Sequence, residues 1–125
     1  MARKILGVVA GLAVWVTVVG VVGAIMRVSW PAYSSVADAM TFTLPMLFAR
    51  LSIGTLATLA TGTVTATIVP QPKLARLIPG VLLLIGFIPV HVMLWDKFPV
   101  WYHLTFLLSL VPLTYLGGTW RGLAE

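Results

Sequence analysis

Two histidines are the residues whose type and spacing best suit chemistry. His91 and His103 each stand about one helical turn from the short loop that separates the last two apolar stretches. If those stretches form an antiparallel helical hairpin, both imidazoles lie at the same depth near one end of it. Neutral imidazoles can bind a metal, or haem iron as axial ligands. The rings can equally hydrogen-bond Tyr102, Asp96 or head-group water.

The histidine pair alone does not predict a metal or a cofactor. A zinc site needs further ligands, and the chain has no cysteine and only two histidines. No glutamate lies near the pair in the sequence. Interfacial hydrogen bonding is therefore the leading interpretation, and we predict neither a metal nor a cofactor. A haem- or metal-binding role stays open as an alternative.

Arg50 stands inside an apolar stretch, where ionisable residues are functional candidates by default. If its helix begins near Pro45, Arg50 lies about one turn inside the bilayer. The guanidinium can extend to the head groups, or it can face inward and pair with Asp38 or Asp96. Such a pair would fix that end of the bundle or bind an anionic head group. The candidate polar site therefore consists of Arg50, Asp38, Asp96, His91 and His103.

Several function classes fit poorly because their chemical groups are missing. No carboxylate lies inside an apolar stretch, which disfavours a proton-coupled exporter of the small multidrug type. The sequence has no glycine-rich phosphate loop and no Ser-His-Asp arrangement. Its net charge of +5 lies mainly between the apolar stretches, which fits an anionic lipid surface better than nucleic acid. We therefore predict neither an enzyme nor a nucleic-acid partner.

The elements that position these residues follow from composition. Only 9% of the 125 residues are charged and 60% are hydrophobic, whereas soluble domains have about 25% charged residues. Four charge-free stretches are long enough to cross a hydrocarbon core of about 30 Å, and helix satisfies the backbone within each stretch. The sequence predicts an all-α integral membrane four-helix transmembrane bundle in a single domain, 1–125, with helices at about 5–26, 46–69, 77–95 and 99–118.

The basic residues predict how this bundle is oriented. Five of the eight lie at the ends that share one side: Arg3, Lys4, Lys73, Arg76 and Arg121. Because loops on the cytoplasmic side are enriched in lysine and arginine, we expect both termini inside (N-in/C-in). The segment 27–45 is then interfacial on the outer side, with a short amphipathic helix. We expect the first stretch to be an uncleaved anchor, because it is longer than the apolar core of a signal peptide.

Small residues predict how the helices pack. Lipid tails are as apolar as leucine, so close approach of small residues drives helix association in a bilayer. The second helix carries Gly54, Thr58, Gly62 and Ala66 at four-residue spacing, and the first carries Gly7 and Gly11. We expect these two faces to contact one another. The threonines of the second helix can bond carbonyls of their own helix, or they can line a polar path through the membrane.

The C-terminal half carries short motifs with a family resemblance. Pro99-Val100-Trp101-Tyr102 forms a P-x-W-Y turn before the last helix, and Pro112 begins a P-x-x-x-L-G-G ending. The small-residue second helix runs into Pro70. These features resemble an uncharacterised group of small bacterial four-helix inner-membrane proteins. The resemblance implies a multi-pass protein of the bacterial inner (plasma) membrane and brings no established activity.

Three hypotheses for function follow. The first is a non-enzymatic integral membrane protein, a structural or accessory component that associates with itself as a homo-oligomer or with a larger membrane complex. The second is an oligomeric channel or transporter for small solutes, with the threonine-rich helix along the path. The third is a haem- or metal-binding membrane subunit that uses His91 and His103. The lipid bilayer is the partner common to all three.

Overall fold

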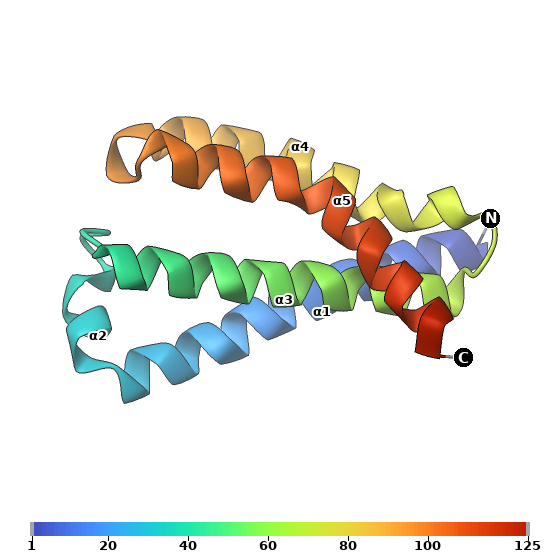
Figure 1. The fold of residues 1–125 in the computed structure, drawn as a ribbon, viewed down its shortest axis with the longest axis horizontal. Helices are drawn as coiled ribbons and strands as arrows, with labels where there is room; N and C mark the ends of the chain where they lie inside the picture. The colour runs from blue at the N-terminus through green and yellow to red at the C-terminus, as the bar shows by residue number, and fades with distance from the viewer. Residues whose placement is uncertain (1, 125) are drawn as a thin grey trace.

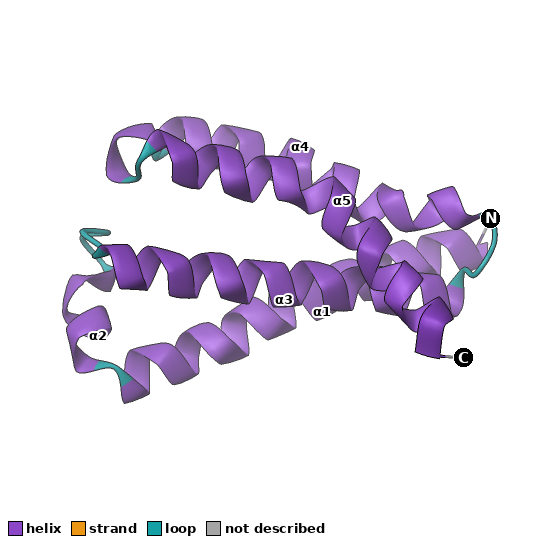
Figure 2. Cartoon of the chain, viewed as in Figure 1, coloured by secondary structure: helices purple, strands orange, loops and turns teal. Residues whose placement is uncertain are grey.

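The structure is a computed structural model that describes residues 2–124, with side chains described for residues 2–119. Within this part every regular element is a helix, and short loops join the helices (Figures 1 and 2). In chain order the elements are α1 (Ala2–Ser29), α2 (Pro31–Ala37), α3 (Leu44–Ile68), η1 (Lys73–Arg76), α4 (Leu77–Met93), η2 (Trp95–Lys97) and α5 (Val100–Ala124), where η marks a short 3₁₀ helix.

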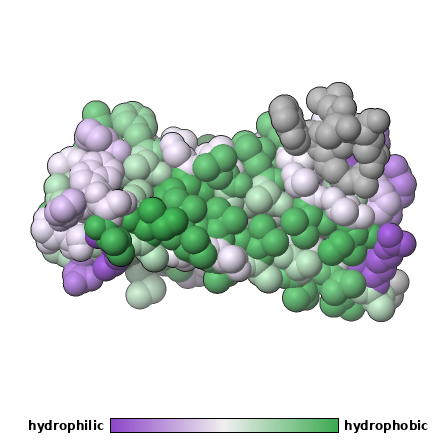
Figure 3. Space-filling model, turned by 90° about the horizontal axis from the view of Figure 1, so that it is seen from below, coloured by the Kyte–Doolittle hydropathy of each residue, from purple (hydrophilic) through white to green (hydrophobic). Residues whose placement is uncertain are grey.

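Four of these helical segments are long and apolar enough to cross a membrane. They cover Ala2–Ser29, Leu44–Ile68, Lys73–Met93 and Val100–Thr119. Large apolar side chains point outward along them, as a lipid-facing surface requires, for example Val28, Met93 and Leu108. Hydrophobic residues cover the middle of the molecule in Figure 3, and hydrophilic residues gather at its two ends. The predicted all-helical, four-span fold is therefore confirmed.

Helix α3 is the central helix of the bundle. It packs against α1 on one flank and α5 on another, while α4 packs mainly against α5. The two chain termini lie at one end of the molecule (Figure 1). The opposite end holds α2 and η2, and we call this part, residues 29–44 and 94–99, the distal end. The two helix pairs α1–α3 and α4–α5 diverge toward the distal end (Figure 1).

Contact between α1 and α3 uses glycine on one helix and threonine on the other. The Thr61 hydroxyl donates to the Gly11 carbonyl at 2.9 Å, and the Thr65 hydroxyl donates to the Gly7 carbonyl at 3.1 Å. A Cβ added at Gly11 would overlap the Thr65 hydroxyl. The two backbones therefore approach as closely as small residues allow, which is how membrane helices associate. The expected partner face differs, because Gly7 and Gly11 meet the threonine side of α3, whereas Gly54 and Gly62 of the predicted face meet α5.

Helix α5 crosses α3 at a second close contact. A Cβ added at Gly62 of α3 would overlap the Thr114 carbonyl, and one added at Gly117 of α5 would overlap the Leu59 carbonyl. The Thr63 hydroxyl also donates to the Gly117 carbonyl at 2.8 Å. Helix α5 bends along its length (Figure 1), and Pro112 lies inside it, where the missing N–H weakens the helix. The bend lets the last part of α5 lie across α3.

The segment predicted to lie at the interface, 27–45, is shorter than expected. Helix α1 continues through Arg27 to Ser29, because a cation is favourable in the last turn of a helix. Pro31 then begins α2, a helix of only 7 residues. Helix α3 begins at Leu44, and α5 continues to Ala124, beyond the expected end near residue 118.

Candidate functional site

A cavity of about 220 Å³ lies between the two helix pairs in the distal half of the bundle. Residues of all five α helices line it, so the whole chain contributes to its walls. An apolar cavity of about 150 Å³ is enough to bind benzene inside a protein. This cavity is therefore large enough for an aromatic ring or for the head of an amphiphile.

Aromatic rings form the deep end of the cavity, near the middle of the bundle. Trp15 of α1 lies 5.0 Å from Phe87 of α4 and 6.5 Å from Phe106 of α5, measured between ring centroids. The indole N–H of Trp15 donates to the Thr58 hydroxyl at 3.1 Å, and that hydroxyl donates to the Gly54 carbonyl at 2.6 Å. The one tryptophan in the middle of a span is thus fixed in position by α3.

Five stacked or nearly parallel rings lie beside the cavity toward the distal end, and we call them the aromatic row. Successive ring centroids lie 5.9, 5.2, 5.9 and 4.6 Å apart. In order, the rings are Trp30, Tyr33, Phe42, Phe98 and Tyr102. They come from α2 and its N-terminal cap, the loop before α3, the loop before α5, and α5 itself. Three of them, Tyr33, Phe98 and Tyr102, line the cavity.

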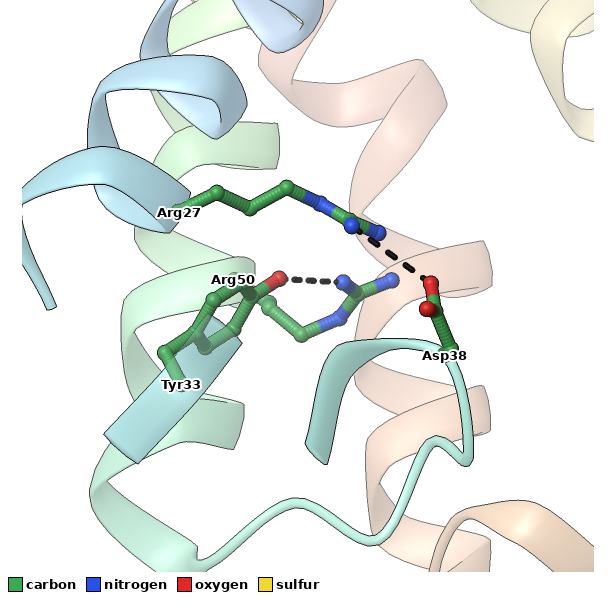
Figure 4. A network of polar contacts seen from close by, with 4 residues as sticks. All are labelled: Arg27, Tyr33, Asp38 and Arg50. Carbon is green, nitrogen blue, oxygen red and sulfur yellow. Dashed lines mark hydrogen bonds and ion pairs between the residues drawn. The ribbon is translucent and has the colours of Figure 1, made fainter. Parts of the chain in front are cut away.

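Arg50 lies between the cavity and the aromatic row. Its Nη1 donates to the Tyr33 hydroxyl at 2.7 Å, and its Nε donates to the Tyr102 hydroxyl at 3.2 Å. The guanidinium carbon lies 4.6 Å from the ring centroid of Phe42 and 5.6 Å from that of Phe98, so the cation is attracted to both ring faces. Figure 4 shows the Tyr33 hydroxyl pointing at the guanidinium. Arg50 is thus directed inward.

The ion pair between Arg50 and an aspartate, one of the two alternatives for this residue, is not formed. Asp38 pairs with Arg27 instead, at 3.5 Å (Figure 4), and its side chain is 97% exposed. Asp96 lies in the exposed turn η2 and makes no ion pair with any side chain of residues 2–119. The reason is positional, because both aspartates lie on the water-facing surface of the distal end while tyrosine hydroxyls reach Arg50 from within. Among the described side chains, no carboxylate neutralises Arg50.

The two histidines contact one another directly. Their Nδ1 atoms lie 2.6 Å apart, and His103 Nε2 lies 3.1 Å from the Trp95 carbonyl oxygen. A carbonyl oxygen only accepts, so the hydrogen-bond network assigns the His103 proton to Nε2. His103 Nδ1 then accepts from the N–H of His91 Nδ1. This assignment leaves His91 Nε2 as an acceptor, on a residue that lines the cavity.

This geometry does not fit a metal or a haem between the rings. Two imidazoles on a tetrahedral zinc, with Zn–N bonds of about 2.0 Å, hold their nitrogens about 3.3 Å apart. Axial histidines of a haem lie on opposite sides of the iron and cannot contact each other. No group of three metal-ligating side chains occurs among the described residues. The pair instead ties α4 to α5 beside the cavity.

The threonines of α3 do not line an open path. Thr58, Thr61 and Thr65 are at most 1% exposed, and Thr61 and Thr65 point into the contact with α1. Each of the others donates to a carbonyl of its own helix four residues earlier, as Thr55 does to Leu51 at 2.9 Å. These hydroxyls are used for packing, which removes the feature that suggested a channel along α3.

Phe42 and Phe98, which carry the cation–π contacts, could not be identified from the sequence because each reads as one more apolar residue of a loop.

Comparison with known protein families, with characterised proteins and with solved structures finds no match to this chain. The resemblance of the C-terminal motifs to small bacterial membrane proteins stays a prediction. The function proposed for the chain therefore rests on the geometry of this cavity.

Proposed function

We propose that the chain is a non-enzymatic integral membrane protein that binds a small amphipathic ligand inside its helix bundle. The observation that carries this proposal is the cavity of about 220 Å³ in the distal half, with aromatic walls and a few polar groups. Such an apolar pocket with convergent polar groups is the usual form of a small-molecule site. Binding, rather than catalysis, is the better fit because no nucleophile with an adjacent base lines the cavity within the described residues.

The direct test fills the cavity and leaves the rest of the bundle unchanged. An uncharged alkyl diazirine, activated by light in nanodiscs, should label cavity residues such as Ile53 and Tyr102. Val19→Phe, at a residue that lines the cavity, should abolish this labelling. Val16→Phe is the matched control on the same helix, because Val16 is 66% exposed and faces away. Labelling confined to outward-facing residues in the unmodified protein would refute the proposal.

A second candidate function is that of an accessory component that associates with itself or with a larger membrane complex. The small-residue faces of α1 and α3 are already occupied inside the chain, the first by α3 and the second in part by α5. Gly20 and Gly86 have open space where a Cβ would be, so association would use the outer surfaces of α1 and α4. Gly20→Leu should then convert an oligomer in mild detergent to a monomer, as measured by light scattering, whereas a monomeric unmodified protein would exclude association with itself.

We also propose that both termini face the cytoplasm of a bacterial inner membrane. The end that holds the termini carries Arg3, Lys4, Lys73 and Arg76, and positive residues favour the cytoplasmic side. A reporter fused after Glu125 should be active only in the cytoplasm. Activity of a periplasmic reporter at that position would reverse the orientation and place the distal end inside the cell.

A further inference from the structure

We infer that the cavity selects an anionic amphiphile, whose carboxylate or phosphate head group binds Arg50 while its chain extends between α1 and α4 into the bilayer. This inference rests on the proposed ligand-binding function and adds the class of ligand. It concerns three features that the cavity brings together: a cation without a counter-ion, donors left for a ligand, and a lateral opening.

The charge of Arg50 is the first feature. A cation taken out of water is costly unless it is paired, and within a membrane such a residue marks a functional site. Two neutral hydroxyls and two ring faces surround the guanidinium. No carboxylate among the described side chains reaches it. An anion entering the cavity therefore gains an attraction that nothing in this part of the chain already supplies.

The remaining donors of Arg50 are the second feature. A guanidinium has five N–H groups in a planar fork, and two of them donate to Tyr33 and Tyr102. Three are left without a partner among the described residues, enough for the two-point contact that arginine makes with a carboxylate or a phosphate. The tyrosines hold the fork in a fixed orientation, so little side-chain freedom is lost when an anion binds.

Access from the bilayer is the third feature. Three rings of the aromatic row line the cavity toward the distal end, while α1 packs mainly on α3 and α4 mainly on α5. Val19 and Gly23 of α1 and Val90 of α4 line the cavity. A Cβ added at Gly23 would meet nothing within 4 Å, and Val90 is 40% exposed. An acyl chain can therefore leave the cavity between α1 and α4 and stay in lipid.

The test compares two diazirine probes that differ only in their heads, a fatty acid and the corresponding fatty alcohol, in nanodiscs of zwitterionic lipid at pH 9. The full-length protein should be labelled at cavity residues about tenfold more by the acid, as expected for one charge-assisted hydrogen bond. Arg50→Gln should lower labelling by the acid to the level of labelling by the alcohol, because the cation that selects the acid is lost. Arg27→Gln is the matched control, because Arg27 lies at the same end, is 53% exposed and is not part of the cavity wall.

Competition in the unmodified protein keeps the test decisive if Arg50→Gln fails to fold. Oleate or phosphatidylglycerol should displace the acid probe. The one that competes more strongly identifies the preferred head group as a carboxylate or a phosphodiester. Displacement by inorganic phosphate at the same concentration would show a site for a small free anion. It would overturn the inference that the ligand is an amphiphile. Equal labelling by acid and alcohol would overturn selection by charge while leaving the proposed function standing. Absence of any cavity labelling would refute both.

Discussion

The Nδ1 atoms of His91 and His103 lie 2.6 Å apart, so a single hydrogen bond between two imidazoles joins α4 to α5 next to their connecting turn. His103 is fully buried and also bonds the Trp95 carbonyl, on the turn itself. Its ring stacks on Trp95 with centroids 4.6 Å apart. One side chain therefore holds together both helices and the turn between them.

His103→Ala should destabilise the bundle by about 1–3 kcal/mol, because it leaves His91 and the Trp95 carbonyl without their partner. Reversible unfolding in mixed micelles measures this loss. Thr105→Ala, at an exposed position on the same helix, is the control and should change stability by less than about 0.5 kcal/mol. Because the rings bond one another, zinc should not raise the unfolding midpoint of the unmodified protein. A zinc-dependent increase would contradict that geometry.

Gly117→Ala should cost about 1–3 kcal/mol through overpacking. The added methyl group would overlap the Leu59 carbonyl where α5 crosses α3, and backbone atoms cannot rotate away as a side chain does. Gly20→Ala makes the same chemical change on α1 where nothing lies within 4 Å. It should be neutral or stabilising by up to about 1 kcal/mol, from helix propensity alone. Equal effects of the two variants in the unfolding assay would contradict the crossing geometry.

The effects of substituting Trp15 and Thr58 on the stability of the bundle should depend on one another. Trp15→Phe removes the indole donor and Thr58→Val removes the hydroxyl, and each should cost about 1 kcal/mol. In the double variant the two losses should not add, and the difference measures the bond between them. Thr17→Val is the control, because its exposed hydroxyl bonds only the Ala13 carbonyl of its own helix. Strict additivity would show that the two side chains do not interact.

Phe42→Leu should weaken labelling by the fatty-acid probe without changing labelling by the alcohol. The substitution keeps an apolar side chain but removes the ring face 4.6 Å from the guanidinium of Arg50. A cation–π contact contributes about 0.5–1 kcal/mol at a partly exposed site, so the tenfold preference for the acid should fall by about 2- to 5-fold. Phe48→Leu removes a ring that packs on Trp101 and is 54% exposed, and it should have no effect. A larger loss of acid labelling in Phe48→Leu than in Phe42→Leu would place the anion outside the aromatic row.

The spans could be predicted from the sequence because a helix that crosses lipid needs a stretch of about 20 apolar residues without charges. The small residues of α1 and α3 likewise indicated close packing, but the partner of Gly11 is Thr61, outside the four-residue series, and Gly62 of that series packs on α5. The partners of Arg50 could not be predicted in the same way. Phe42 and Phe98 lie in loops, where no periodicity indicates which way a side chain faces, and the turn before α3 includes Met40 with a backbone φ of 57°. The aspartates carried the obvious opposite charge, but both lie on the exposed surface of the distal end, whereas tyrosine hydroxyls and rings reach the guanidinium from within.

The residues that contact Arg50 are synthesised at different times, some before it and some after it. Tyr33 and Phe42 precede it, whereas its second tyrosine follows 52 residues later, and domains form from the N-terminus during synthesis. When α3 first enters the bilayer, Arg50 therefore has only the rings encoded before it. Its stable residence in the membrane depends on the later arrival of the α4–α5 hairpin. A chain stopped before Phe98 would lack the Tyr102 hydroxyl and one of the two ring faces that surround this arginine.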